Sequence, residues 1–230
     1  MTCLVDPQVE KAKVLVNYAK GDFSLRKEVE KIVEEAPVLI RSTPKLDTGP
    51  FQFEEEVLNG IINAGKNVVE MNFATSTFGN VSVFFNEKMY ISSTGSQLDN
   101  LKDSISICDF NGNLLNSIEP SSEYPSHFET YKKTSARCIL HAHPFFTVAM
   151  SMIAGVGKTL FGIPIVGGEA GGGKDGIVHT VPFELKKLNI VVVHGHGVFA
   201  VDSFDFNNPL NAIHKLEKLS RKRYISKYLS

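Results

Sequence analysis

The feature that most constrains the fold is an apolar segment with two histidines, Cys138-Ile139-Leu140-His141-Ala142-His143-Pro144. A short apolar run of this kind predicts a buried strand. Side chains two residues apart on a strand share a face and lie about 6.6 Å apart, so His141 and His143 can converge on one ion. Burying an imidazole costs free energy unless it is hydrogen-bonded or coordinated. The alternative is a pair of core histidines satisfied by backbone carbonyls.

A second pair of histidines occurs in the segment Val193-His194-Gly195-His196-Gly197, also within an apolar run. Histidine is a common zinc ligand, and catalytic zinc sites use three protein ligands. Two pairs on two apolar segments favour a shared ligand set over isolated core histidines. The sequence therefore predicts a buried metal site.

Composition and charge exclude several classes of partner. The chain has 230 residues and a formal net charge of −1, without a basic stripe in its central region, so we expect neither a nucleic acid nor an acidic membrane as partner. Its basic segment, residues 215–227, is expected to be a solvated or subunit-facing helix surface. Three widely spaced cysteines, no long apolar stretch and acidic residues near the N-terminus predict a cytoplasmic protein with free thiols.

The chain is expected to consist of a helical extension, residues 1–50, and a main domain, residues 51–230. Charged helical patterns cover residues 8–20 and 24–36, and prolines and glycines interrupt the chain before residue 51. In the main domain, an amphipathic helix begins near Phe53, and Ser122 is expected to cap a helix that carries Glu123 and His127 on one face. Strands are predicted at 81–85, 89–93, 105–110, 137–143, 163–166, 177–182 and 190–201, with further helices at 145–154 and from Pro209.

The glycine-rich stretch Gly167–Gly173 is a weak signal for a dinucleotide or phosphate loop. A dinucleotide fingerprint needs a strand, a glycine turn and a helix, whereas Lys174-Asp175-Gly176 leads here into another β-rich run. A flexible loop beside the active site is the preferred interpretation, with Glu169 a carboxylate of unassigned role.

Several motifs in a fixed order resemble the class II aldolase and adducin-head family over roughly residues 53 to 220. They are Thr77-Phe78-Gly79-Asn80-Val81-Ser82, Ile91-Ser92-Ser93-Thr94-Gly95, Pro120-Ser121-Ser122-Glu123, His127, His141-Ala142-His143 and His196-Gly197. The resemblance implies an α/β fold with a central, mainly antiparallel β-sheet flanked by helices. It also implies a ring-like homotetramer.

The resemblance further implies the residues of the active site. His141, His143 and His196 would bind Zn²⁺ or another divalent ion, and three imidazoles leave one coordination position open. His194 would not be a ligand but could support one. Glu123 would be the catalytic acid/base, although by itself a glutamate at this point could merely match the helix dipole.

A substrate phosphate would be held by hydroxyls and backbone N–H groups of three turns. The residues that the resemblance assigns to this phosphate site are Thr77, Gly79, Asn80, Thr94, Gly95, Ser121 and Ser122. The chain departs from the fuculose-type aldolases in lacking their subunit-bridging tyrosines, because residues 161–173 contain none. Tyr224 and Tyr228 are candidate substitutes, and the sugar specificity is open.

The function that these features imply is a zinc-dependent sugar-phosphate aldolase, an aldehyde-lyase that reversibly cleaves a ketose phosphate through a metal-stabilised enediolate. Enzyme alternatives in the family are a pentulose-phosphate 4-epimerase, which usually has Asp at the place of Glu123, a methylthioribulose-phosphate dehydratase and a 3-oxo acid phosphate decarboxylase. The non-enzyme alternative is an adducin-like interaction module. Retention of three histidines and Glu123 argues against that module.

Overall fold

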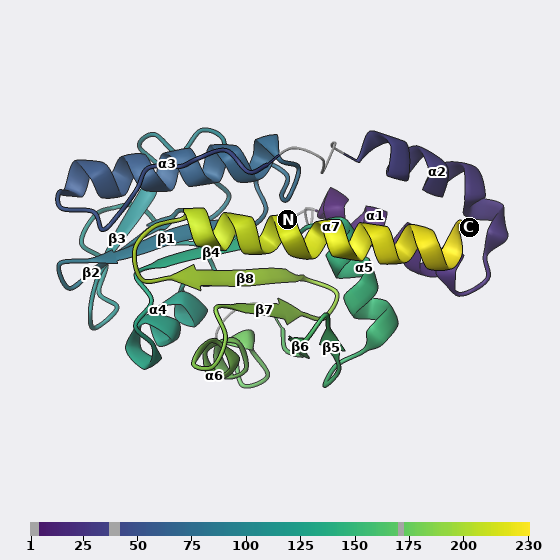
Figure 1. The fold of residues 1–230 in the computed structure, drawn as a ribbon. Helices are drawn as coiled ribbons and strands as arrows, with labels where there is room; N and C mark the ends of the chain where they lie inside the picture. The colour runs from purple at the N-terminus through teal and green to yellow at the C-terminus, as the bar shows by residue number, and fades with distance from the viewer. Residues whose placement is uncertain (1–4, 37–41, 170–172) are drawn as a thin grey trace.

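The computed structural model describes residues 5–36, 42–169 and 173–230, and a β-sheet forms its centre (Figure 1). In the described residues eight strands lie in the order β3-β2-β1-β4-β8-β7-β6-β5, and every neighbouring pair is antiparallel except β6 with β7. The predicted α/β fold with a mainly antiparallel sheet is confirmed. The strands are β1 (Asn80–Phe85), β2 (Lys88–Ser92), β3 (Ile105–Asp109), β4 (Cys138–Ala142), β5 (Thr159–Leu160), β6 (Ile163–Val166), β7 (Ile190–Val193) and β8 (Gly197–Asp202).

Helices cover both faces of the sheet and bury two apolar clusters. The larger cluster lies under α1, α3, α5 and α7, and the smaller one under α4 and α6 (Figure 1). The α-helices of the described residues are α1 (Pro7–Ala19), α2 (Arg26–Glu35), α3 (Glu54–Glu70), α4 (Tyr124–Lys133), α5 (Phe145–Ala154), α6 (Val181–Leu185) and α7 (Asn207–Tyr228). None of them combines the length and the apolar character that a membrane crossing requires.

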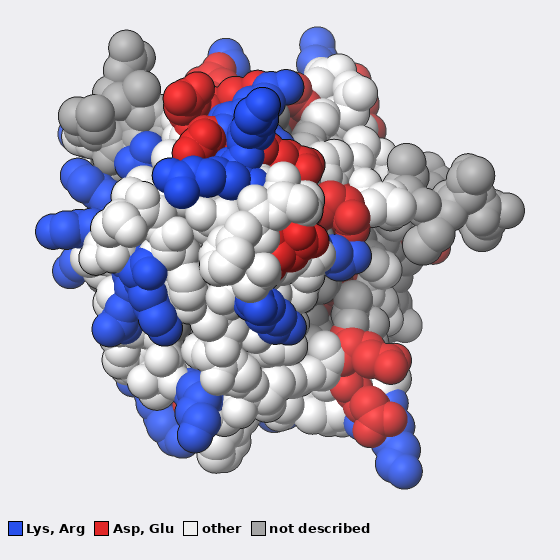
Figure 2. Space-filling model, turned by 90° about the vertical axis from the view of Figure 1, so that its right-hand side faces the viewer, with Lys and Arg blue, Asp and Glu red and all other residues white. Residues whose placement is uncertain are grey.

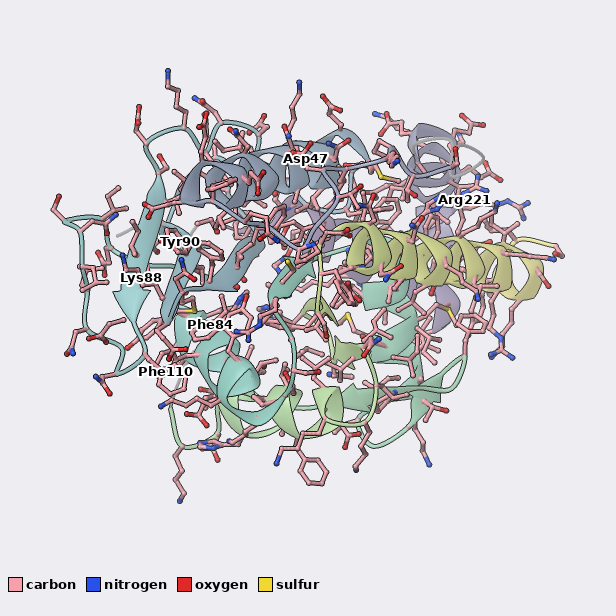
Figure 3. The ribbon with its side chains drawn as sticks, turned by 60° about the vertical axis from the view of Figure 1, so that its left-hand side comes forward. Asp47, Phe84, Lys88, Tyr90, Phe110 and Arg221 are labelled. Carbon is pink, nitrogen blue, oxygen red and sulfur yellow. The ribbon has the colours of Figure 1, made fainter. Side chains whose placement is uncertain are left out.

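Short-range chemistry explains the hairpin of β1 and β2. Asn86 and Glu87 have φ values of 47° and 58°, which is the left-handed pair that a two-residue hairpin turn needs. Lys88 pairs with Phe85, so the turn is one residue shorter than the sequence predicts. Beyond the hairpin, Phe84 contacts Phe110 with ring centroids 5.6 Å apart, on the face of the smaller cluster (Figure 3).

Two of the strand predictions are wrong. Residues 190–201 do not form one strand, because a turn at His194–His196, with Gly195 at φ 66°, divides β7 from β8. The two histidines therefore lie in a turn and share no strand face. Residues 177–182 form a 3₁₀ turn (Ile177–His179) and the start of α6 instead of a strand, because Ile177, Val181 and Leu185 recur at helical spacing and all three are buried.

The two N-terminal helices lie close to where their periodicity predicts them and complete the larger cluster. Leu15 of α1 is fully buried, and its carbonyl oxygen accepts a hydrogen bond of 2.7 Å from the hydroxyl of Tyr224 in α7. In α2, the carbonyl oxygen of Val33 accepts one of 3.3 Å from Arg221 (Figure 3). The division of the chain at residue 50 stays a prediction, although the core runs through both parts.

Charged side chains are dispersed where α2 and the C-terminal half of α7 lie. Lys and Arg side chains are mixed with Asp and Glu over one part of this face, and elsewhere on it they stand among uncharged residues (Figure 2). The C-terminal half of α7 adds no acidic side chain, because residues 218–228 contain neither Asp nor Glu. Part of the mixing comes from α2, in which Arg26 pairs with Glu30 and Lys31 with Glu35. The expectation that residues 215–227 form a solvated or subunit-facing helix surface stays a prediction.

Candidate metal centre

Three histidines converge at one end of the central strands. His141 lies in β4, His143 lies one residue beyond it, and His196 lies in the turn between β7 and β8. The Nε2 atom of His141 is 2.8 Å from that of His143 and 3.1 Å from that of His196. Around a tetrahedral zinc ion, nitrogen ligands would be about 3.3 Å apart. The donor set and its spacing therefore fit a zinc ion bound by three imidazoles.

Glycine permits the close approach of these segments. A Cβ on Gly197 would lie 2.5 Å from the carbonyl oxygen of Ala142 and 2.6 Å from the ring of His143. A Cβ on Gly79 would lie 2.6 Å from the carbonyl oxygen of His141. Because both approaches involve backbone, any larger residue would push the strands apart.

The imidazole of His141 is held in the form that a metal requires. Its Nδ1 donates a hydrogen bond of 3.0 Å to the carbonyl oxygen of Val198, and its ring stacks on Phe199 at a centroid distance of 3.9 Å. This bond leaves the lone pair of Nε2 facing the other two histidines. Burial lowers the pKa of His141 well below its ordinary value, which keeps the ring neutral.

Glu123 faces the same point as the three imidazoles. Its Oε1 is 2.9 Å from Nε2 of His196 and its Oε2 is 3.1 Å from Nε2 of His141, while the amide of Asn80 donates to Oε2 over 2.8 Å. Burial works to raise the pKa of Glu123, but the imidazoles of His141 and His196 and the amide of Asn80 hold it well below its ordinary range. The carboxylate is therefore ionised at neutral pH.

The start of α4 differs from the prediction. Glu123 itself is the residue that precedes α4, and no side chain caps this helix. The predicted capping role of Ser122 is therefore wrong, and its side chain is exposed. Ser121 instead accepts a hydrogen bond of 3.4 Å from the backbone N–H of Glu123, and Pro125 lies in the first turn, where its missing N–H is harmless.

A buried chain of hydrogen bonds orients Glu123. Oδ1 of Asn80 accepts from Nε2 of His127, whose Nδ1 is 2.7 Å from the hydroxyl of Ser82, and that hydroxyl is 2.6 Å from the hydroxyl of Tyr131. Burial lowers the pKa of His127 to about 4, so its neutral Nδ1 can accept from Ser82. The sequence pattern places His127 and Glu123 on one helix face, but it gives no sign that Asn80 joins them.

The residues expected to hold a phosphate lie in turns that are connected by backbone hydrogen bonds. The backbone N–H groups of Leu98, Thr94 and Ser121 donate to the carbonyl oxygens of Ser76, Glu119 and Ser92, over 2.6, 3.2 and 3.1 Å respectively. Of the assigned residues, Thr77, Thr94, Gly95 and Ser122 are exposed, Gly79 is half-buried, and Asn80 and Ser121 are buried. The side chain of Asn80 is engaged by Glu123 and His127, which leaves the other six for a phosphate.

Other candidates lie apart from this centre. His194 does not belong to the group of three histidines, and its backbone N–H donates to Val166 over 2.9 Å. Glu169 is exposed, and residues 170–172 of the glycine-rich stretch lie outside the described residues. The hydroxyl of Tyr224 is buried against Leu15, so its suggested role as a substitute for a substrate-binding tyrosine is wrong.

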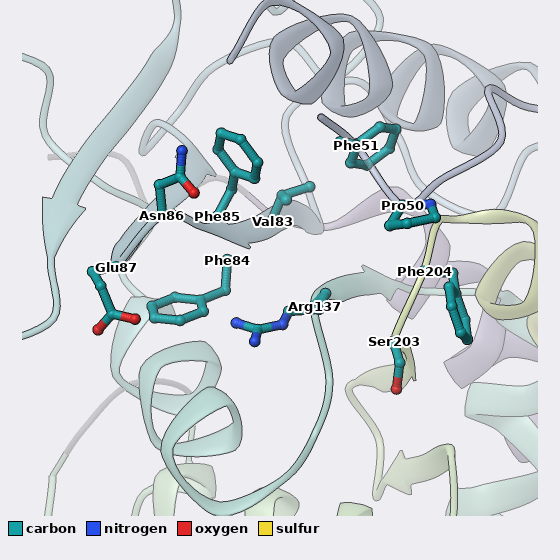
Figure 4. Close-up of a pocket in the computed structure, with 10 residues that line it drawn as sticks. All are labelled: Pro50, Phe51, Val83, Phe84, Phe85, Asn86, Glu87, Arg137, Ser203 and Phe204. Atoms are coloured by element: carbon teal, nitrogen blue, oxygen red, sulfur yellow. The ribbon is translucent and has the colours of Figure 1, made fainter. Parts of the chain in front are cut away.

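A pocket of about 310 Å³ lies at the opposite end of β1 and β4 (Figure 4). Its lining includes Phe51, Phe84, Arg137 and Phe204, and the guanidinium of Arg137 lies 5.4 Å from the ring centre of Phe84. Arg137 precedes His141 by four residues of an extended strand, which is about 13 Å. This pocket is therefore separate from the metal centre.

One residue of the centre was missed by the sequence analysis. Nδ1 of His143 is hydrogen-bonded to the carboxylate of Asp6, which immediately precedes α1. The two residues are 137 positions apart in the chain, and an aspartate before a helix has the ordinary interpretation of a cap.

Two curated proteins are similar in sequence to part of this chain. A curated 3-oxo-tetronate 4-phosphate decarboxylase of Haemophilus influenzae is 30% identical over 96 residues, which cover 40% of this chain and 46% of that protein. An L-fuculose phosphate aldolase of Methanococcus maripaludis is 31% identical over 98 residues, covering 42% and 54%. The chain thus spans about half the length of these curated relatives.

A solved structure shares the fold, and a family assignment covers most of the main domain. The crystal structure of L-fuculose-1-phosphate aldolase from Thermus thermophilus superimposes with a TM-score of 0.60 at 22% identity, over 73% of this chain and 90% of that one. Residues 59–223 match the class II aldolase and adducin N-terminal domain. The match includes the three histidines and Glu123, and the chain belongs to the class II aldolase and adducin N-terminal domain family.

Proposed function

We propose that this protein is a metal-dependent sugar-phosphate aldolase, which cleaves a ketose phosphate into an aldehyde and a phosphorylated ketone. The observation that carries the proposal is the position of Glu123, whose two carboxylate oxygens lie 2.9 and 3.1 Å from the Nε2 atoms of His196 and His141. An ionised carboxylate beside an ion-binding imidazole cluster is the arrangement that enolate chemistry needs. An interaction module would have no use for it.

In this proposal His141, His143 and His196 hold a zinc or other divalent ion. When bound, the ion supplies Lewis acidity to the oxygen atoms of the ketone half of the substrate. Glu123 removes the proton from the carbon next to the carbonyl in the synthetic direction and returns it after cleavage. Asn80 donates a hydrogen bond to one oxygen of Glu123 and so fixes the orientation of the carboxylate beside the imidazoles. Burial excludes water from this proton transfer.

Phosphate binding is assigned in the same proposal to the exposed and half-buried turn residues beside β1 and β2, together with the buried Ser121. The residues are Thr77, Gly79, Thr94, Gly95, Ser121 and Ser122, which offer hydroxyls and backbone N–H groups.

By family likeness we also propose a homotetramer, which light scattering of the purified protein would test. A mass near that of one chain would contradict it.

The substitution Glu123→Gln tests the role of the carboxylate. An amide of the same shape cannot accept the proton, so we expect turnover to fall by about 10² or more while bound metal stays near the wild-type level. Proton exchange on dihydroxyacetone phosphate, followed by NMR with and without a panel of aldehydes, is the measurement. Glu129→Gln, on an outer face of the same helix, is the matched control. A wild-type exchange rate in Glu123→Gln would remove Glu123 from the mechanism.

Decarboxylation of a 3-oxo acid phosphate is the second candidate, favoured by the similarity to the Haemophilus influenzae decarboxylase. It uses the same enolate but breaks a bond to CO₂, so no proton has to leave the carbon first. Release of CO₂ from a 3-oxo acid 4-phosphate, without proton exchange on dihydroxyacetone phosphate, would replace the aldolase proposal. Purified protein without any bound metal would instead favour the interaction module.

A further inference from the structure

The contact between His143 and Asp6 links the metal centre to a part of the chain outside the family match. The match begins at residue 59, and Asp6 belongs to the segment that precedes it. Both side chains are nearly inaccessible, with Asp6 9% and His143 5% exposed. A buried carboxylate is costly unless it is hydrogen-bonded, and the Nδ1 of His143 is its hydrogen-bond partner.

Three hydrogen bonds hold the start of α1, and with it Asp6, beside His143. Its Oδ1 accepts a hydrogen bond of 2.9 Å from the backbone N–H of Gln8, which fixes the start of α1. The side chain of Gln8 donates to the carbonyl oxygen of Asn72 over 2.7 Å, and the backbone N–H of His143 donates to Phe73 over 2.7 Å. Residues 72 and 73 therefore hold the start of α1 and His143 side by side, and α1 packs along α5, which begins two residues after His143.

The chemistry of the contact determines which nitrogen of His143 can bind an ion. A carboxylate can only accept, so Nδ1 of His143 carries the hydrogen and Nε2 keeps its lone pair. That Nε2 is the atom that lies 2.8 Å from Nε2 of His141. Loss of a carboxylate that supports a metal-binding histidine typically weakens metal binding about 10- to 100-fold.

We propose that Asp6 is a positioning residue for the metal centre, so that the N-terminal extension sets the metal affinity of the domain that follows it. The inference rests on the proposed ion-binding role of the three histidines but not on which reaction they support. His141 obtains the equivalent support from a backbone carbonyl within the family domain, at Val198. For His143 the support comes from the residue that precedes α1.

The test compares Asp6→Asn and Asp6→Ser with wild type and with Glu10→Gln, all as full-length protein. Asparagine and serine keep the capping bond to Gln8, so α1 is retained. Asparagine can still accept from Gln8, but then presents its N–H₂ group to Nδ1 of His143, which favours the wrong tautomer. Serine is too short to reach the ring. Glu10→Gln removes the same charge from the exposed first turn of α1, where Glu10 pairs with Lys13.

Zinc affinity is measured by competition with a chromophoric chelator, and melting of the metal-free protein reports folding. We expect affinity to fall about 10- to 100-fold in both Asp6 variants and to be unchanged in Glu10→Gln, with metal-free melting temperatures that stay close to wild type. We expect a downfield NMR signal from the proton on Nδ1 of His143 in wild type, and its loss in Asp6→Asn.

Two results would overturn the inference, and they are distinguishable. Wild-type zinc affinity in both Asp6 variants would show that Asp6 only caps α1, while leaving the metal centre intact. Wild-type protein that binds neither zinc nor another divalent ion would reject the metal centre itself, and the dependence on Asp6 with it.

Discussion

At the scale of single residues, the proposal assigns three histidines as metal ligands and leaves out His194, which lies two residues before His196. His141→Ala, His143→Ala and His196→Ala should each remove most of the bound metal, because each deletes one of three Nε2 donors. His194→Ala should retain it, since His194 lies outside this group. Metal content of the purified variants by atomic emission is the measurement. Full occupancy in His196→Ala would contradict the assignment.

The buried side chain of His127 leads to a prediction about the stability of the protein at low pH, also at the scale of a single residue. Its pKa is lowered to about 4 in the folded protein, against an ordinary value of 6.5. Between pH 4 and pH 6.5, His127 is protonated in the unfolded chain but neutral in the folded protein. Protonation of the unfolded chain therefore lowers the free energy of unfolding as the pH falls from 6.5 toward 4, whereas above pH 6.5 His127 has no such effect. The shift corresponds to a loss on the order of 3 kcal/mol. Metal-free wild type should therefore lose more unfolding free energy than His127→Gln between about pH 7 and pH 4.5 in urea titrations, and equal losses would contradict the prediction.

At the scale of elements, the start of α5, the helix that follows β4, is capped by a side chain of α7. The carboxylate of Glu217 in α7 accepts hydrogen bonds of 2.9 and 2.8 Å from the backbone N–H groups of Phe146 and Thr147 at the start of α5. Glu217→Ala leaves these buried donors without a partner, which should destabilise the protein by about 1–3 kcal/mol in urea unfolding. Lys218→Ala, on the exposed side of α7, is the control, and equal stabilities would show that water replaces the carboxylate.

At the scale of the whole molecule, the N-terminal helices belong to the core of the folded chain. Leu15, Val16, Val29 and Ile32 are all buried in the cluster that also contains residues of α5 and α7. Burial of four such side chains contributes about 6–12 kcal/mol, which is comparable with the stability of a typical domain, and a chain without them loses this contribution. Deletion of residues 1–36 should therefore abolish cooperative melting seen by circular dichroism. A truncated protein with a wild-type melting temperature would show that the remaining chain folds alone.

The sequence by itself determined the features that depend on local pattern. Alternating and continuous apolar runs predicted β1, β2, β3, β4 and β6, because burial periodicity is a property of neighbouring residues. The motifs around His141, His143, His196 and Glu123 predicted the family and the residues that meet in the structure. Where one pattern fits two structures, as at residues 177–182, the prediction failed.

Only the tertiary structure decided which distant side chains share the centre. The turn that brings His196 to β4 depends on Gly197 meeting the backbone of Ala142. Asn80 reaches Glu123 because β1 pairs with β4 and places Asn80 opposite His141, which Glu123 also contacts. Asp6 reaches His143 across 137 residues because α1 packs on α5. These contacts follow from the packing of elements far apart in the chain, and no local pattern of residues encodes such a distance.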